Sequence, residues 1–257
     1  MISVIIPSYK DKYLNKTIQS LLDNTGGEIE VIVVIDGYPL RQPLPDDDRV
    51  KPIVLEDNVG MREAINIGVR ESSGEYIMRS DEHCRFGNEY DTALTADIAD
   101  NWIVTPLRYK LNVEQWKVEG TPIGYEKLYI QNWELGKKFG SRPWKLRNKE
   151  RKNYPVDETM AMQGSCWLMS RKHWDAVIKE LDPAYGTLYQ DSVEMIFKTW
   201  QAGGKLMLNK TTWYAHKDRR FKRTHQYPHT KAKVTFEYAL SLWEDYYREV
   251  IQPRWGV

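Results

Sequence analysis

Short apolar runs rich in β-branched residues alternate with amphipathic segments in the N-terminal third of the chain, and this alternation restricts the fold more than any other feature. Apolar runs of this length predict strands, and the segments between them place apolar residues at helical intervals. Strands that alternate with helices imply right-handed crossovers and a mainly parallel sheet covered on both faces. The sequence therefore predicts an α/β fold, with strands at 2–7, 30–37, 51–57 and 75–81 and helices at 12–24 and 59–74.

Polar motifs follow three of these predicted strands: "PSYKD" (7–11), "DGY" (36–38) and "SDEHC" (80–84). In parallel sheets, ligands bind beyond the carboxyl ends of the strands. Taken alone, Asp81, Glu82 and His83 fit either a polar turn or a divalent-cation site. The convergence of three such motifs at one sheet edge favours the ligand site.

The second half of the chain is less regular. Residues 108–158 mix aromatic and basic residues and show little clean periodicity. Elsewhere the patterns predict strands at 102–107 and 205–209, a strand turning into a helix at 163–178, and helices at 191–204 and 233–251.

Composition limits the class of protein. The net charge is +1, and the two cysteines show no paired spacing, which argues against a disulfide framework and a cysteine zinc site. The N-terminus does not read as a signal peptide, and no apolar run approaches the roughly 20 residues of a membrane helix. We therefore expect a soluble, cytoplasmic protein.

Several motifs together resemble a known family. "ISVIIPSYKDKYLNKTIQSLL", "EVIVVIDG" and a strand ending in an acidic motif resemble the nucleotide-sugar half of family 2-like glycosyltransferases with the GT-A fold. "GMREAINIGVRESSGEYIMRSDEHC", "MQGSCWLMSRKHW" and "DSVEMIFKTWQAGGKL", the last followed by "YAH", are more similar to the polypeptide N-acetylgalactosaminyltransferases. The similarity covers most of residues 1–216.

This resemblance implies one GT-A catalytic domain over residues 1–257 that transfers a sugar from a nucleotide diphosphate, with UDP favoured, to an acceptor hydroxyl. The nucleotide-binding half would span 1–107, the acceptor and metal half 108–232, and a C-terminal helix 233–257.

The resemblance also implies a metal site. The Asp-x-His element and the downstream histidine of the family match Asp81, His83 and His216. Mixed oxygen and imidazole ligation suits Mn²⁺, with Mg²⁺ as a substitute. Such an ion bridges the two donor phosphates and neutralises the charge of the leaving group.

Donor contacts are expected at five further groups of positions. The resemblance places Asp36 at the base or ribose edge, although Ile35 stands where the family usually has a preceding acid; an ordinary Asp-Gly turn is the alternative. Arg62 would reach a phosphate or lie on a solvated helix face. The remaining positions are Pro7, Ser8 and Tyr9 beside the nucleoside, Gly164 and Ser165 beside the sugar, and Arg219 and Arg220 beside the pyrophosphate. A simple packing glycine is the alternative for Gly164.

No residue matches the catalytic base of inverting relatives. The alignment of residues 191–204 with their late helix places Ser192 at that position, and a serine does not usefully accept the acceptor's proton. We therefore expect retention of anomeric configuration. Asp191 and Glu194 would position the donor sugar or acceptor, or act only as carboxylates near a helix N-terminus.

The sequence is compatible with two classes of acceptor. Residues 137–152 carry eight Lys/Arg against one acid, and residues 216–233 carry seven against Asp218. This segregation favours a polyanionic partner such as DNA bearing a hydroxymethylated base, with a surface or lipid-linked glycan as the alternative. Outside glycosyl transfer, a sugar-1-phosphate nucleotidyltransferase or a non-catalytic nucleotide-sugar binding module stays open.

Overall fold

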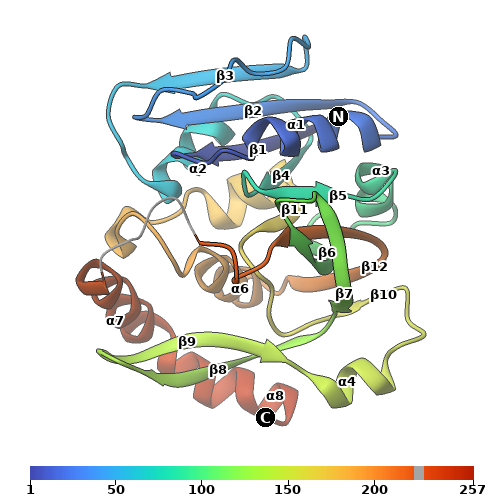
Figure 1. Ribbon diagram of the computed structural model, residues 1–257. Coiled ribbons are helices and arrows are strands. Elements are labelled where there is room, and N and C mark those ends of the chain that lie inside the picture. Colours follow the sequence, from blue (N-terminus) through green and yellow to red (C-terminus); the bar gives the residue numbers. More distant parts are fainter. Residues whose placement is uncertain (223–228) are drawn as a thin grey trace.

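The computed structural model describes residues 1–222 and 229–257. Its centre is a sheet with the strand order β10-β12-β6-β11-β4-β1-β2-β3 (Figure 1). The strands on this path are β1 (Ile2–Ser8), β2 (Ile29–Asp36), β3 (Val50–Leu55), β4 (Tyr76–Ser80), β6 (Trp102–Asn112), β10 (Val156–Glu158), β11 (Cys166–Ser170) and β12 (Lys205–Lys217).

Most of these strands run in one direction. β3, β2, β1 and β4 pair parallel with one another, and β6 pairs parallel with β12. β11 lies antiparallel between β4 and β6, and β10 is antiparallel to β12. The predicted α/β class with a mainly parallel sheet is confirmed.

Helices cover both faces of the sheet. On one face, Ile18 and Leu21 of α1 (Leu14–Asn24) belong to the same apolar cluster as Val4 and Val33. On the other face, Ile5 and Val34 join a second apolar cluster with residues of α2 (Met61–Arg70) and α6 (Asp191–Gln201). Because alternate residues of β1 and β2 enter opposite clusters, these strands need apolar residues throughout. β3 lies at the edge, where Pro52 is tolerated.

β12 is longer than the predicted strand at 205–209. It continues through an irregularity in register between Asn209 and Trp213 and pairs with β6 as far as Lys217. β5 (Cys84–Phe86) then pairs antiparallel with its second part, and α3 (Tyr90–Thr95) follows β5. The bulge lets one strand carry His216 beyond the core to the residues that follow β4.

Residues 108–158 contain elements that the sequence did not predict. β7 (Lys117–Ile123) pairs with β6, and β8 (Glu126–Trp133) and β9 (Gly136–Pro143) form a separate two-stranded sheet followed by α4 (Lys145–Glu150). α7 (His229–Tyr246) runs alongside β9, and α8 (Gln252–Trp255) ends beneath the hairpin (Figure 1).

The remaining elements are short: α5 (Arg171–His173), π-helical turns at Trp174–Ile178 and Tyr247–Ile251, and a 3₁₀ turn at Pro183–Tyr185. Within the described part of the chain, no helix combines the length and the apolar character that crossing a membrane requires.

Candidate active site

Three side chains that are distant in the sequence meet where β4 and β12 end. Asp81 and His83 follow β4, and His216 is the penultimate residue of β12. His216 Nε2 lies 3.0 Å from Asp81 Oδ2 and 3.1 Å from His83 Nε2. His83 Nε2 lies 3.8 Å from the same Asp81 oxygen. The three ligand atoms all lie within 4.8 Å of one another, close enough to share one cation.

Strand pairing brings this cluster together. Cys84, the first residue of β5, lies opposite His216 in the antiparallel ladder. The backbone N–H of Lys217 donates to the carbonyl of His83 at 3.1 Å. This pairing therefore fixes the backbone on both sides of the cluster.

The protonation states suit metal binding. Burial opposes ionisation of Asp81, but Arg79 and the two histidines outweigh it and hold the pKa of Asp81 well below its ordinary value. Burial lowers the pKa of His216 to about 4, although its hydrogen bond with Asp81 acts in the opposite direction. At neutral pH the cluster thus offers a carboxylate and a neutral imidazole, the forms that bind metals.

Arg79 is a site residue that sequence reasoning missed. Its Nη2 donates to Asp81 Oδ1 at 2.5 Å, and its Nη1 lies 3.6 Å from Asp191 Oδ2. The Arg79 side chain is only 4% exposed, so it links the two carboxylates within the protein. The available signal was its position two residues before Asp81, since residues two apart at a strand end share a face.

Asp191 and Gly164 lie against each other beside this link. Asp191 is the first residue of α6 and is buried. A Cβ on Gly164 would lie 2.4 Å from Asp191 Oδ2, so a larger residue would collide with the carboxylate. Among the described residues, that oxygen has no hydrogen-bond partner. Ser165 joins the same region, because its carbonyl accepts the N–H of Asp81 at 3.0 Å.

The end of β1 is tied to the same turn. The N–H of Tyr9 donates to Glu82 Oε2 at 3.0 Å. Burial and the charge of Asp11 raise the pKa of Glu82 well above its ordinary value, although a hydrogen bond with Ser8 lowers it in part. The Tyr9 and Tyr38 rings meet edge to face at 6.0 Å, and Lys10 Nζ lies 4.7 Å from each ring. These groups, together with Pro7 at the end of β1, form an aromatic, cationic rim next to the cluster.

Asp36 lies at the predicted strand end with its carboxylate turned to the backbone of the following loop. The side chain accepts the N–H groups of Val59 at 2.7 Å and Gly60 at 3.0 Å, and the amide of Asn58 at 2.8 Å. Burial raises the pKa of Asp36, although these hydrogen bonds lower it in part. In this structure Asp36 anchors the loop that precedes α2, and its contact with a nucleotide stays a prediction.

The assignments of Arg62 to a phosphate and of Glu194 to the substrate need correction. The two side chains form a buried ion pair, with Arg62 1% and Glu194 0% exposed. Arg62 also donates to the carbonyls of Asp182 and Tyr189, and Glu194 pairs with Lys198. Both charges are satisfied inside the protein, so neither lies on a solvated helix face or at an open site.

Arg219 and Arg220 follow β12 and are both exposed. Arg220 forms an ion pair with Glu119. Burial lowers the pKa of Lys138, and the charge of Arg219 acts in the same direction. Neither arginine contacts the metal-ligand cluster through an interaction seen here, and their role toward a pyrophosphate stays a prediction. Residues 223–228 of the second basic stretch lie outside the described residues.

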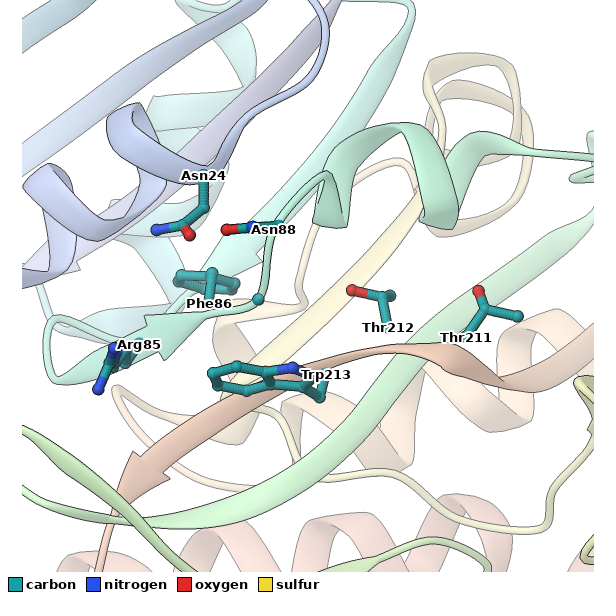
Figure 2. A pocket seen from close by; sticks show the side chains of 8 residues that line it. Asn24, Arg85, Phe86, Asn88, Thr211, Thr212 and Trp213 are labelled. Carbon is teal, nitrogen blue, oxygen red and sulfur yellow. The ribbon is translucent and has the colours of Figure 1, made fainter.

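A separate polar hollow of about 370 Å³ lies at the far end of β5. Figure 2 shows Trp213 and Thr212 of β12 on one side and Asn24 and Asn88 on the other. None of the residues that line it belongs to the predicted donor or metal site. They are Asn24, Arg85, Phe86, Gly87, Asn88, Thr211, Thr212 and Trp213.

Curated proteins similar to the chain carry N-acetylgalactosaminyltransferase names. The chain is 23% identical over 245 residues to probable N-acetylgalactosaminyltransferase 6 of Caenorhabditis elegans, and the match covers 83% of this chain and 37% of that protein. It is 24% identical over 271 residues to polypeptide N-acetylgalactosaminyltransferase 3 of Taeniopygia guttata, covering 98% of this chain and 43% of that protein. The chain therefore spans less than half the length of these two relatives.

Solved structures confirm the GT-A fold expected from the sequence. GalNAc-T7, crystallised with UDP, GalNAc and Mn²⁺, superposes with a TM-score of 0.80 at 19% identity, over 98% of this chain and 50% of that one. S. aureus TarS 1–349 gives a TM-score of 0.56 at 15% identity, over 84% of this chain and 60% of that one. The family model described as "Glycosyl transferase family 2" matches residues 3–177. Since this match covers more than half of the sequence, the chain belongs to glycosyl transferase family 2.

Proposed function

We propose that the chain transfers a sugar from UDP to an acceptor hydroxyl with the help of Mn²⁺, or of Mg²⁺ in its place. The observation that carries this proposal is the approach of Asp81, His83 and His216 to within 4.8 Å of one another. One carboxylate and two imidazoles form a donor set that suits Mn²⁺. The UDP and Mn²⁺ with which GalNAc-T7 was crystallised support the same donor and ion.

Asp81 Oδ2 and the Nε2 atoms of His83 and His216 would hold the ion. A bound Mn²⁺ would neutralise charge on the departing diphosphate. Arg79 holds the other oxygen of Asp81 and thereby fixes the orientation of the carboxylate. Tyr9, Lys10 and Tyr38 would border the nucleoside. Gly164 leaves room for the carboxylate of Asp191, which would lie beside the sugar together with Ser165.

Calorimetric titration tests the donor and the metal. We expect UDP to bind the protein in Mn²⁺ and to bind at least tenfold more weakly in EDTA, because the diphosphate would lose its bridging cation. UDP-sugars, compared under the same conditions, identify the sugar by their hydrolysis or transfer. Equal affinity for UDP with and without Mn²⁺ would contradict the proposed metal role.

For the reaction we propose retention of anomeric configuration. Ser192 stands where inverting relatives carry the base, and Asp191 lies 3.6 Å from the guanidinium of Arg79, which favours a positioning role for this side chain. A donor phosphate oxygen would then accept the acceptor's proton on the same face of the sugar. Proton NMR of the fresh product is expected to show the donor's anomeric configuration. An inverted product would instead assign Asp191 as the general base.

For the acceptor we propose a polyanion, with DNA carrying hydroxymethylated bases as the first candidate. The support is a basic surface formed by exposed cations of β9, α4 and the residues just after α4. In this stretch Arg147 and Arg151 pair with Asp157 and Lys138 is half-buried, whereas the remaining cations are exposed. We define this basic surface as Lys137, Arg142, Lys145, Lys149 and Lys152. A DNA acceptor would require extrusion of the target base from the duplex.

Salt dependence separates the two acceptor classes. For duplex DNA, the logarithm of the binding constant should fall with the logarithm of salt concentration by about 0.9 per phosphate contact. Lys145→Gln with Lys149→Gln should reduce that slope by about 2, whereas Lys205→Gln on the start of β12 should leave it unchanged. Fluorescence anisotropy with labelled duplex gives the slopes. A salt-independent affinity for saccharides, without affinity for DNA, would favour the glycan alternative.

A further inference from the structure

We propose that Asp11 is a positioning residue that fixes the tautomer of His83 and so directs Nε2 of that ring toward the cation. The inference rests on the metal site of the proposed function. Asp11 Oδ2 lies 3.1 Å from His83 Nδ1, on the opposite side of the ring from His216. Asp11 lies in the loop between β1 and α1, distant in sequence from all three proposed metal ligands.

Two hydrogen bonds orient the carboxylate of Asp11, which also lies close to Glu82. Asp11 Oδ1 accepts the N–H of Tyr13 at 2.7 Å, and Oδ2 faces His83 Nδ1. The Asp11 side chain is 4% exposed, so water competes little for these oxygens. An ionised carboxylate can only accept hydrogen bonds, which requires the proton of His83 to lie on Nδ1. His83 Nε2 then carries the lone pair that a metal needs.

The contacts on the Nε2 side of the His83 ring are consistent with a proton on Nδ1. His83 Nε2 lies 3.1 Å from His216 Nε2, and His216 Nε2 lies 3.0 Å from Asp81 Oδ2. Since Asp81 and His83 Nε2 both accept, the proton between the two rings belongs to His216. The cluster thus forms one consistent chain of donors and acceptors from Asp11 to Asp81. On metal binding only His216 has to release or move its Nε2 proton.

Asp11→Asn gives the sharpest test because asparagine is nearly isosteric but has one acceptor and one donor. The N–H of Tyr13 requires an oxygen, so the new NH₂ group would face His83 Nδ1 and force the proton to Nε2. That tautomer blocks the metal position. Asp11→Ala removes the same charge but imposes no tautomer. We therefore expect Asp11→Asn to weaken Mn²⁺ binding 10–100-fold and Asp11→Ala to weaken it less.

Two measurements test whether Asp11 fixes the tautomer of His83. Calorimetry gives Mn²⁺ affinities for the wild type, for both variants and for the exposed control Asp100→Asn, which should match the wild type. Nitrogen-15 NMR of the metal-free protein reports the ring tautomers, with His83→Gln used to identify the signals of His83. We expect protonated Nδ1 in the wild type and protonated Nε2 in Asp11→Asn.

The outcomes are distinct. Wild-type protein without Mn²⁺ affinity would refute the proposed metal site. Wild-type protein that binds Mn²⁺ but carries the His83 proton on Nε2 when metal-free would refute the role of Asp11, and this measurement needs no variant to fold. An Asp11→Ala variant that loses more affinity than Asp11→Asn would also overturn the proposal, because a packing role favours the isosteric substitution.

Discussion

An Asp81→Asn variant is expected to lose the stabilisation that Mn²⁺ and UDP together give the wild-type protein. Asparagine keeps the volume of Asp81 and an acceptor for Arg79, which donates to Asp81 Oδ1 at 2.5 Å. It removes the negative charge that the pKa of Asp81, held well below its ordinary value, guarantees at neutral pH. Ligand binding to the native state stabilises it by the logarithm of ligand excess over Kd, so the lost increment is directly measurable as a change in Tm.

The effect on transfer should be larger still. A cation at a departing diphosphate contributes several kcal/mol of transition-state stabilisation, which corresponds to a factor of about 10²–10⁴ in rate. His216→Gln should behave similarly because its Nε2 lies 3.1 Å from that of His83. His173→Gln serves as the matched control, since His173 is buried against Thr199 outside the cluster. We expect it to lower Tm but to keep the full increment from Mn²⁺ and UDP.

Other results for these variants would contradict a cation bound by all three side chains. If Asp81→Asn and His216→Gln both keep the wild-type increment and rate, the three side chains form a hydrogen-bonded cluster without a cation. An effect of Asp81→Asn alone, with His216→Gln unaffected, would reduce the site to the residues that follow β4 and remove β12 from it.

The position of Asp81 and His83 at the sheet edge could be predicted because it depends on local features of the sequence. The apolar runs before Ser8 and Asp81 define where two strands end, and parallel strands bring those ends to one edge. His216 required the family resemblance, since the predicted strand stopped at residue 209. No local pattern indicated that β12 continues past its irregularity to pair with β5.

The environment of charged residues with buried partners could not be predicted from the sequence. Arg62 has helical spacing that fits either an exposed face or a phosphate contact, and its partner lies 132 positions away in the chain. The same holds for Arg79, whose contact with Asp191 joins residues that are 112 positions apart in the chain. Burial of a charge is decided by tertiary packing, and a single sequence carries no periodic signal for it. The β8–β9 hairpin was missed for a related reason, because its basic and aromatic residues obscure the apolar alternation.

An Arg62→Met variant is expected to lower the free energy of unfolding by about 3–5 kcal/mol, because it leaves a buried carboxylate without its main partner. Glu194 is 0% exposed, and Lys198 together with the N–H of Asp182 would be its remaining partners. The carbonyls of Asp182 and Tyr189 would also lose the donors of Arg62. Urea denaturation followed by circular dichroism measures the change, with an unaltered slope showing that the denatured state is comparable.

Arg70→Met is the matched control on the same helix. Arg70 pairs with Glu63 at 2.7 Å, but its side chain is 55% exposed, so the loss should stay below about 1 kcal/mol. The double variant Arg62→Met, Glu194→Leu removes both charges of the pair, so neither is left buried without a partner. It should therefore recover much of the stability that Arg62→Met loses. If Arg62→Met instead unfolds like Arg70→Met and binds UDP poorly, Arg62 would belong to the donor site after all, and the ion pair seen here would be a resting arrangement that opens for phosphate.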